Sequence, residues 1–177
     1  MNDCRWEWTD APDGVVGVVA SSTMIERIYY VSSRGSLRRA LCQDFPEAGQ
    51  AQSHLVRETL GQIKEYFQGK RWMFDLPLNQ RELTDFQRAV HTTLMATRPG
   101  ETISYAELAE KAGFSGAARA VGQVMASNPF PIVVPCHRVI HRDGSLGSYS
   151  AASGAASKQQ LLAAERQMNQ NINAFSG

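Results

Sequence analysis

The hydrophobic pattern changes along the chain from short β-rich runs to longer amphipathic helices. Within residues 13–31, the runs GVVGVVA and MIERIYYV are rich in β-branched and aromatic residues and are separated by SST. This composition predicts a β-hairpin. Two helices are predicted next, at residues 35–42 and 54–68. One face of the second helix has the spacing of an amphipathic helix packed on a sheet, with Leu60, Ile63, Tyr66 and Phe67.

The segment GKRWMFDLPLN, residues 69–79, predicts a turn, a short strand and the residues by which the chain leaves that strand. Beyond it, three helix starts carry Ser or Thr followed three positions later by Glu or Gln, the signature of a capping box. They are Thr84 with Gln87, Ser104 with Glu107, and Ser157 with Gln160. A boundary near residues 79–83 therefore predicts a small α/β domain at residues 1–80 and a mostly helical domain at residues 81–177.

Residues 103–129, ISYAELAEKAGFSGAARAVGQVMASNP, predict a helix, a tight turn at Gly113 and a second helix. This is the outline of a helix-turn-helix, a common DNA-binding arrangement. The second helix is rich in small residues, and Arg119 is its one cation. Small residues allow either close approach to a partner or tight packing on the core, so the pattern alone leaves both interpretations open.

Composition excludes several classes of protein. The chain has 177 residues and a net charge of +1, which predicts no global field for nucleic acid or membrane. No run of about 18 apolar residues exists, and the N-terminus lacks an apolar signal core, so we expect a cytoplasmic protein with no membrane partner. We expect a monomer. Cys4, Cys42 and Cys136 cannot all pair and show no CxxC spacing, so reduced thiols are expected.

The stretch PFPIVVPCHRVIHRDGS, residues 129–145, places Cys136 and His137 side by side after an apolar run. A single cysteine after a buried strand is usually an inert small hydrophobe. A reactive cysteine needs a base nearby, because the thiolate is the nucleophile. Neighbours in a strand point to opposite faces, so pairing with His137 requires the chain to turn, which Pro135 favours. Glu165 is a candidate carboxylate to orient the imidazole.

The ordered set ISYAELAEKAGFSGAARAVG, SNPFPIVV and PCHRVI resembles the active-site domain of the O6-alkylguanine-DNA alkyltransferases, also called methylated-DNA–protein-cysteine methyltransferases. The resemblance extends from about Thr84 to Glu165. It implies an α/β fold, with a small ribonuclease-H-like N-terminal domain and a mostly helical C-terminal domain that contains a helix-turn-helix and the active-site cysteine loop. It also implies a partner, double-stranded DNA containing O6-alkylguanine, and no cofactor.

The resemblance implies a role for each matching residue. Cys136 would accept the alkyl group, and His137 would take the thiol proton through a water, oriented by Glu165. Tyr105 would donate to the leaving guanine, since charge developing on that base must be neutralised. Asn128 would brace the cysteine loop.

Further residues are implied around the base and the duplex. The substrate pocket would include Val139, through its carbonyl, and Tyr149 and Ser150. Arg119 would replace the extruded nucleotide in the base stack, with Ala118 and Gly122 on the same DNA-binding helix. Such a pocket requires the damaged base to be flipped out of the duplex.

Other interpretations of these residues stay open. Tyr105 could serve packing, Arg119 could bind phosphate only, and Asn128 before Pro129 suits a plain turn. Arg138 is interpreted as a structural or phosphate contact. A zinc site is considered and not assigned, because its candidate ligands do not reproduce the spacing of the family's zinc site; they are Cys4, Cys42, His54 and His91.

The loop YSAASGAASK, residues 149–158, departs from the family pattern, which has two glycines after the tyrosine and a shorter link to the lysine. Ala151 and Ala152 would add methyl groups to the pocket wall and strain the backbone if it needs a positive φ. A longer loop could instead be more mobile and admit larger groups.

The sequence is compatible with three classes of function. Stoichiometric alkyl transfer to Cys136 is favoured. A non-catalytic damage-binding relative would carry Trp in place of Cys136. A cysteine hydrolase with adjacent nucleophile and base would be atypical, and it would turn over, whereas an alkyl acceptor stops after one equivalent.

Overall fold

The computed structural model describes the backbone of residues 4–175 and the side chains of residues 4–171, and it divides into two compact units. The first unit contains residues up to Asn79, together with Pro129–Pro131 and Ala151–Ser153. The second contains Gln80–Asn128, Ile132–Ser150 and the segment from Gly154 onward. The chain therefore leaves the second unit twice, just before the cysteine loop and just after residues 148–150.

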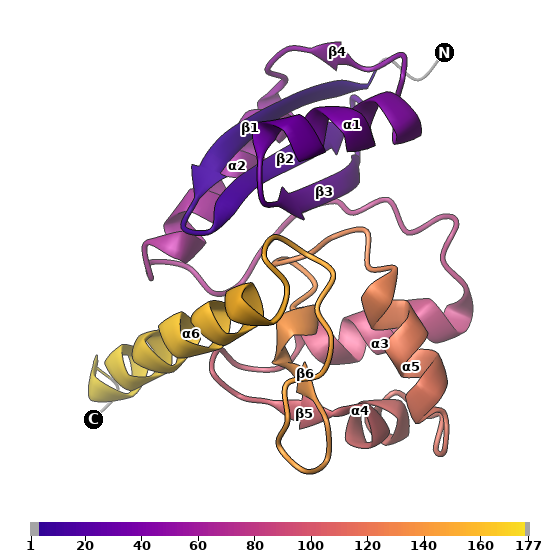
Figure 1. Cartoon of the computed structure of the whole chain (residues 1–177), viewed down its shortest axis with the longest axis vertical. Helices are drawn as coiled ribbons and strands as arrows, with labels where there is room; N and C mark the ends of the chain where they lie inside the picture. The colour runs from indigo at the N-terminus through magenta and orange to yellow at the C-terminus, as the bar shows by residue number, and fades with distance from the viewer. Residues whose placement is uncertain (1–3, 176–177) are drawn as a thin grey trace. The chain divides into compact units, whose positions relative to one another are not determined.

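The first unit is a four-stranded sheet with two helices (Figure 1). The strands are β1 (Arg5–Ala11), β2 (Gly14–Ala20), β3 (Ile25–Val31) and β4 (Gly49–Gln50), in the order β3-β2-β1-β4. Antiparallel pairing of β2 with β3 confirms the predicted hairpin. Strand β1 was not predicted, although Trp6 and Trp8 alternate with polar residues along it.

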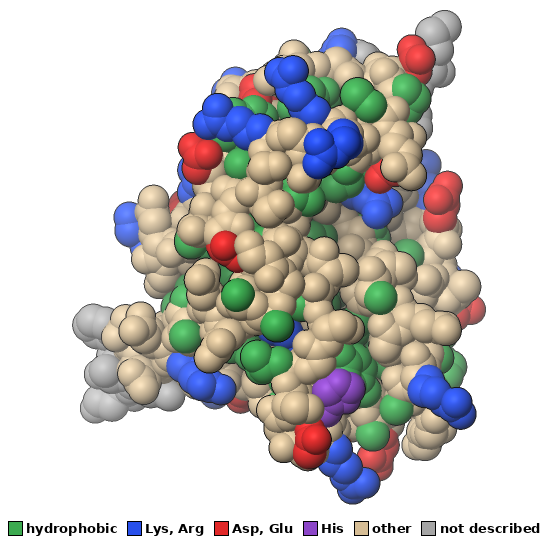
Figure 2. Space-filling model, in the orientation of Figure 1, with side chains coloured by type: hydrophobic (Ala, Val, Ile, Leu, Met, Phe, Trp, Pro, Cys, Tyr) green, Lys and Arg blue, Asp and Glu red, His purple; other side chains and the backbone are tan. Residues whose placement is uncertain are grey.

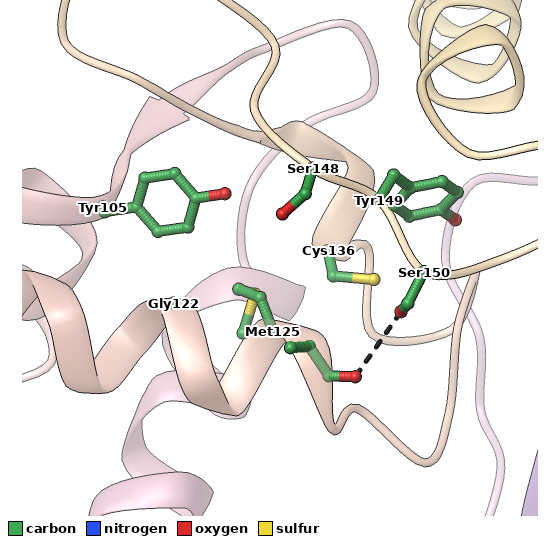
Figure 3. A pocket seen from close by; sticks show the side chains of 8 residues that line it. Tyr105, Gly122, Met125, Cys136, Ser148, Tyr149 and Ser150 are labelled. Carbon is green, nitrogen blue, oxygen red and sulfur yellow. Dashed lines mark hydrogen bonds between the residues drawn. The ribbon is translucent and has the colours of Figure 1, made fainter.

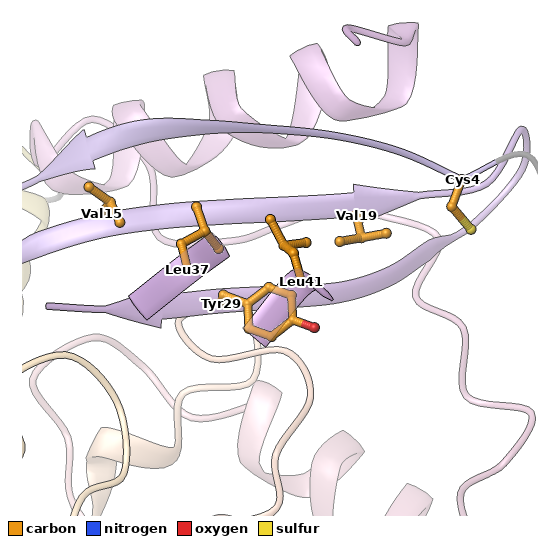
Figure 4. Packing of buried hydrophobic residues seen from close by; sticks show 6 residues of the cluster. All are labelled: Cys4, Val15, Val19, Tyr29, Leu37 and Leu41. Carbon is orange, nitrogen blue, oxygen red and sulfur yellow. The ribbon is translucent and has the colours of Figure 1, made fainter. Parts of the chain in front are cut away.

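Helix α1 (Arg34–Asp44) packs on β2 and β3, and helix α2 (His54–Phe67) packs on β1 and β2. Both helices confirm the predictions at residues 35–42 and 54–68. Figure 4 shows the core under α1, where Leu37 and Leu41 meet side chains of the sheet and Cys4. Gly17 allows this contact, because a Cβ atom there would lie 2.5 Å from Leu37 Cδ1.

The prediction of a short strand within residues 69–79 is wrong. This segment contains only an isolated bridge between Leu78 and Ile25, with backbone hydrogen bonds from Ile25 N–H to Pro77 O and from Asn79 N–H to Ile25 O. Pro77 has no backbone N–H to donate to a ladder, and Leu78 alone pairs with β3.

The second unit consists mainly of helices: α3 (Asp85–Met95), α4 (Tyr105–Lys111), α5 (Ala118–Ala126) and α6 (Ala155–Phe175). Two short strands, β5 (Ile103–Ser104) and β6 (Val139–Ile140), pair in parallel. Helices α4 and α5 pack on each other, and the turn between them includes Gly113, as predicted.

Two of the three predicted capping boxes are confirmed, at Thr84 for α3 and at Ser104 for α4. The third is wrong. Helix α6 begins at Ala155, and the N–H of Lys158 bonds to Gly154 O, so Ser157 lies inside the first turn and is fully buried. The Ser157 and Gln160 pair has the correct spacing, but tertiary burial of Ser157 takes precedence over the local signal.

Among residues 4–175, no helix is long and apolar enough to cross a membrane.

Candidate active site

Cys136 begins a single 3-10 turn, η1 (Cys136–Arg138), directly after Pro135. The Cys136 N–H bonds to Val134 O at 2.8 Å, and the Arg138 N–H bonds to Pro135 O at 2.9 Å. The chain therefore turns directly after Pro135, as the sequence predicts. The turn leaves Cys136 only 6% exposed, at a pocket of about 110 Å³ (Figure 3).

The pocket walls come from three segments of the second unit. Tyr105 from α4 points its hydroxyl into the space, and Gly122 and Met125 come from α5 (Figure 3). The opposite wall is the chain at residues 148–150, where the Ser150 hydroxyl donates to Ala126 O at 3.5 Å. The structure thus brings together five residues proposed from the sequence: Cys136, Tyr105, Gly122, Tyr149 and Ser150.

The Cys136 thiol is held in its protonated form by its surroundings. Burial raises the pKa of the thiol above its ordinary value. Side-chain hydrogen bonds with Asn128 and Tyr149 and the charge of Lys158 oppose this rise without cancelling it. Transfer chemistry at this sulfur therefore needs a group that removes its proton.

His137 and Arg138, which follow the cysteine in the sequence, form a buried ionic cluster with Glu165. His137 Nε2 is 2.8 Å from Glu165 Oε1, and both side chains are fully buried. The Arg138 guanidinium donates from Nε to Glu165 Oε2 at 2.9 Å and from its terminal nitrogen to Oε1 at 2.8 Å. Burial would raise the pKa of Glu165, but His137 and Arg138 lower it well below its ordinary range. Glu165 is therefore a buried carboxylate that orients His137.

Arg138 has a structural role, one of the two interpretations left open for it. Besides Glu165, its guanidinium donates to Thr97 O at 2.6 Å and to Thr97 Oγ1 at 3.0 Å. Glu165 Oε2 also accepts from the Gly100 N–H at 3.0 Å. The cluster thereby ties α6, η1 and the loop after α3 together around His137.

Asn128 and Lys158 hold the loops that form the pocket. The Asn128 amide donates to Val134 O at 2.9 Å, which braces the chain two residues before the cysteine. Lys158 is almost fully buried, and its ammonium donates to Val139 O at 2.6 Å and to Leu146 O. Val139 itself is fully buried in β6 and is not among the residues that line the pocket.

A wider groove of about 450 Å³ continues outward from the pocket, with Tyr105 and Gly122 lining both. Ala118 and Arg119 line the groove at the start of α5, so the structure places all three proposed DNA-binding residues along it. The N-cap residue Ala117 makes no side-chain hydrogen bond to this helix start.

Among residues 4–175, two non-glycine residues have a positive φ, and both lie next to the pocket-forming loops in the sequence. Ile132 has a φ of 76° and Ala152 a φ of 45°. Such backbone costs about 1–3 kcal/mol and is found where the surrounding structure imposes it. Neither Ala151 nor Ala152 lines the pocket, so the prediction that their methyl groups add to its wall is wrong. Both alanines belong to the first unit, where the Ala152 N–H bonds to Tyr30 O at 2.7 Å.

Sequence reasoning missed the clamp that Arg138 forms on Glu165 and the buried Lys158. The signal for both was weak, because a single Arg or Lys is usually a solvated side chain. It also missed Met125 and Ser148, which line the pocket. In the side chains of residues 4–171, no group of three or more His, Cys, Asp and Glu could hold a metal ion.

Sequence comparisons relate the chain to known proteins. Residues 85–167 match the family model described as 6-O-methylguanine DNA methyltransferase, DNA binding domain. A methylated-DNA–protein-cysteine methyltransferase of Mycolicibacterium paratuberculosis is 49% identical over 105 residues, which span 59% of this chain and 62% of the relative. One of Methanosarcina acetivorans is 39% identical over 122 residues, 69% of this chain and 76% of the relative.

Solved structures extend the similarity over nearly the whole chain. The Mycobacterium tuberculosis protein OGT in complex with DNA aligns with a TM-score of 0.76 and 32% identity, over 93% of this chain and 94% of that one. The O6-methylguanine-DNA methyltransferase of Pyrococcus kodakaraensis aligns with a TM-score of 0.66 and 30% identity, over 92% and 98%.

The α/β fold is that of the solved methyltransferase structures. The chain belongs to the methylated-DNA–protein-cysteine methyltransferase family. The sequence match spans 62% of the length of the first curated relative.

Proposed function

We propose that this protein repairs DNA by moving an alkyl group from the O6 atom of guanine to Cys136 in a single, irreversible turnover. The observation that carries the proposal is the position of the Cys136 thiol at the pocket, next in sequence to a histidine that is hydrogen-bonded to a buried carboxylate. Family membership supports the same chemistry.

The step begins with the thiol proton. Because burial keeps the thiol protonated, His137 takes that proton through a water as the sulfur attacks. Glu165 stabilises the imidazolium that forms, and Arg138 keeps Glu165 ionised and in place. The Glu165 carboxylate is thus an orienting group and makes no contact with the substrate.

The transfer is one displacement at carbon. The Cys136 sulfur forms a bond to the O6-bound carbon as the carbon–oxygen bond breaks, and its electron pair stays on the guanine. Tyr105 donates a proton toward that guanine, since its hydroxyl points into the pocket. The protein is left with a thioether, which has no good leaving group, so the acceptor is used once.

The substrate reaches the pocket as a base flipped out of the duplex. A pocket of about 110 Å³ behind an open groove suits an extruded base and not a paired one. Ser150 offers its backbone N–H toward O6, and Tyr149 lines the wall. We assign no substrate contact to Val139, because it is fully buried, does not line the pocket, and its carbonyl accepts from Lys158.

The α4–α5 pair acts as the helix-turn-helix that enters the duplex. Ala118 and Gly122 give α5 a face without bulk, and Arg119 takes the space of the flipped nucleotide. Arg119→Ala should slow repair of duplex DNA far more than reaction with O6-benzylguanine as the isolated base, because only the duplex requires flipping. Equal losses on both substrates would remove Arg119 from this role.

The test uses a duplex carrying O6-methylguanine and the variant Cys136→Ser. Wild type should restore one guanine per protein molecule and then stop. Cys136→Ser should bind the duplex with similar affinity and restore none. Continued turnover by wild type, or repair by Cys136→Ser, would contradict the proposal.

A further inference from the structure

His141 is an ionisable side chain at the outer groove that the alkyl-transfer mechanism does not use. It follows β6 in the sequence, is exposed, and lines the groove together with Arg119. These two are the only residues lining the groove that can carry a positive charge, and none of the residues lining it is acidic. The groove therefore presents the guanidinium of Arg119 and the imidazole of His141.

The position of His141 is fixed by its backbone and its ring. Its N–H bonds to Ser145 O at 2.8 Å, and its carbonyl accepts from the Gly144 N–H at 3.0 Å, so a tight turn begins at this residue. The imidazole packs on the Tyr105 ring, with centroids 5.3 Å apart and planes inclined by 47°. His141 is thus held at the mouth of the pocket.

Gly147 permits this arrangement. Its φ is 66°, and a Cβ atom there would lie 2.8 Å from His141 Nε2 and 3.1 Å from the Tyr105 hydroxyl oxygen. Both polar atoms therefore lie around one point at the edge of the groove, and a side chain at Gly147 would displace them.

The charged groups around His141 come from three segments. Asp143 and Arg142 lie on its own turn, Glu107 on α4 interacts with Arg142, and Arg119 lies on α5. Hydrogen bonds from Ser145 lower the pKa of Asp143, and His141 contributes further to that shift. Asp143 is therefore an anion that partly offsets the basic side chains of the turn.

We propose that the His141 imidazolium binds a phosphate of the DNA backbone in this groove, beside Arg119. The inference rests on the proposed function, because it takes the groove as the DNA site. Phosphates supply most of the affinity of protein–DNA complexes, and each neutralised phosphate adds to the salt dependence. Duplex binding then tightens when the pH favours the imidazolium over the neutral ring.

The experiment measures the dissociation constant of an undamaged duplex at about pH 6 and about pH 8, over a series of salt concentrations. Wild type should bind roughly fivefold tighter at the lower pH, with a salt slope steeper by about 1. His141→Gln should lose both differences. His141→Lys should bind tightly at both pH values. His54→Gln, which changes an exposed histidine in the first unit, is the matched control and should behave as wild type.

A wild-type pH dependence that His141→Gln retains, or the absence of such a dependence in wild type, would overturn the inference. Reaction of the same proteins with O6-benzylguanine as the isolated base separates this failure from that of the proposed function. Alkylation of Cys136 without a pH-dependent duplex affinity would leave the proposed function standing. No alkylation at all would contradict the proposed function itself.

Discussion

In the second unit, individual charged side chains are buried where water cannot solvate their charge. Glu165 is fully buried and keeps its charge through His137 and Arg138. Removing one partner of a buried ionic group costs far more than removing an exposed pair, because it leaves an uncompensated charge. The site therefore depends on all three residues being present.

Glu165→Gln should lower the free energy of unfolding by about 3–5 kcal/mol and slow alkylation of Cys136, because Arg138 loses its anion and His137 its orienting charge. Chemical denaturation and single-turnover kinetics measure the two effects. Glu110→Gln, an exposed change on α4, should alter neither. Equal stability of Glu165→Gln and Glu110→Gln would contradict the account of the cluster.

His91 predicts a separate pH effect. It is 1% exposed in α3, neither of its ring nitrogens has a hydrogen-bond partner, and burial lowers its pKa from 6.5 to about 4. Between these values the unfolded chain binds more protons than the folded one, so stability falls as pH falls from 6.5 to about 4. The loss should reach about 3 kcal/mol.

Denaturation of wild type and His91→Leu over this pH range measures that effect. The variant should lose most of the pH dependence, whereas His54→Leu, at an exposed position, should keep it. Below pH 4.5 a further loss is expected in both, because Glu165 then begins to protonate in the unfolded chain. If His91→Leu kept the wild-type pH dependence of stability, the loss of stability over this pH range would have to come from other groups.

Helix starts show what local sequence signals determine at the scale of elements. Thr84 is exposed and Ser104 is buried in β5, and the local signal was sufficient at both because each side-chain oxygen still accepts from the N–H three residues on. Ser157 carries the same spacing but is buried within the first turn of α6, which no local pattern reveals. The two-residue strands β5 and β6 were likewise not predictable, because they exist only through their pairing with each other.

Ser104→Ala tests the cap of α4, the helix that presents Tyr105. The change removes the acceptor for the Glu107 N–H, which lies 3.2 Å from Ser104 Oγ, and should cost about 1 kcal/mol. Thr92→Ala, at an exposed position inside α3, should instead be neutral or slightly stabilising, since alanine is the better helix former. Denaturation curves that show equal changes would argue against the capping box.

Ala152→Gly tests the strained loop. The φ of 45° should be less costly for glycine, so we expect a gain of about 0.5–1 kcal/mol, while Ala156→Gly in helix α6 should lose a similar amount. Because Ala152 does not line the pocket, the ratio of benzyl to methyl transfer should stay the same. A changed ratio would show that the alanine controls pocket size.

At the scale of the whole molecule, the net charge says little about what the protein binds, whereas the local arrangement of residues says much. Figure 2 shows Lys and Arg interspersed with Asp and Glu over the displayed face, in keeping with a net charge of +1. Composition could therefore not indicate a DNA partner. The family resemblance could indicate a DNA partner, because it depends on short motifs that keep their spacing within the second unit. These motifs are PCHR, the preceding Asn128 and ISY.

The return of residues 129–131 and 151–153 to the first unit lay beyond sequence reasoning. Both segments join that unit through backbone hydrogen bonds to β3, from the Ile28 N–H to Pro129 O and from the Ala152 N–H to Tyr30 O. Backbone groups are the same for every residue type, so these contacts leave no pattern in side chains.

The identity of the alkylated residue tests the central claim most directly. Wild-type protein is mixed with a duplex carrying O6-methylguanine, its intact mass is measured, and the digested peptides are mapped. The account predicts a mass increase of one methyl group, located on the peptide that contains Cys136. A methyl group on Cys4 or Cys42, or unmodified protein after the DNA has been repaired, would contradict it.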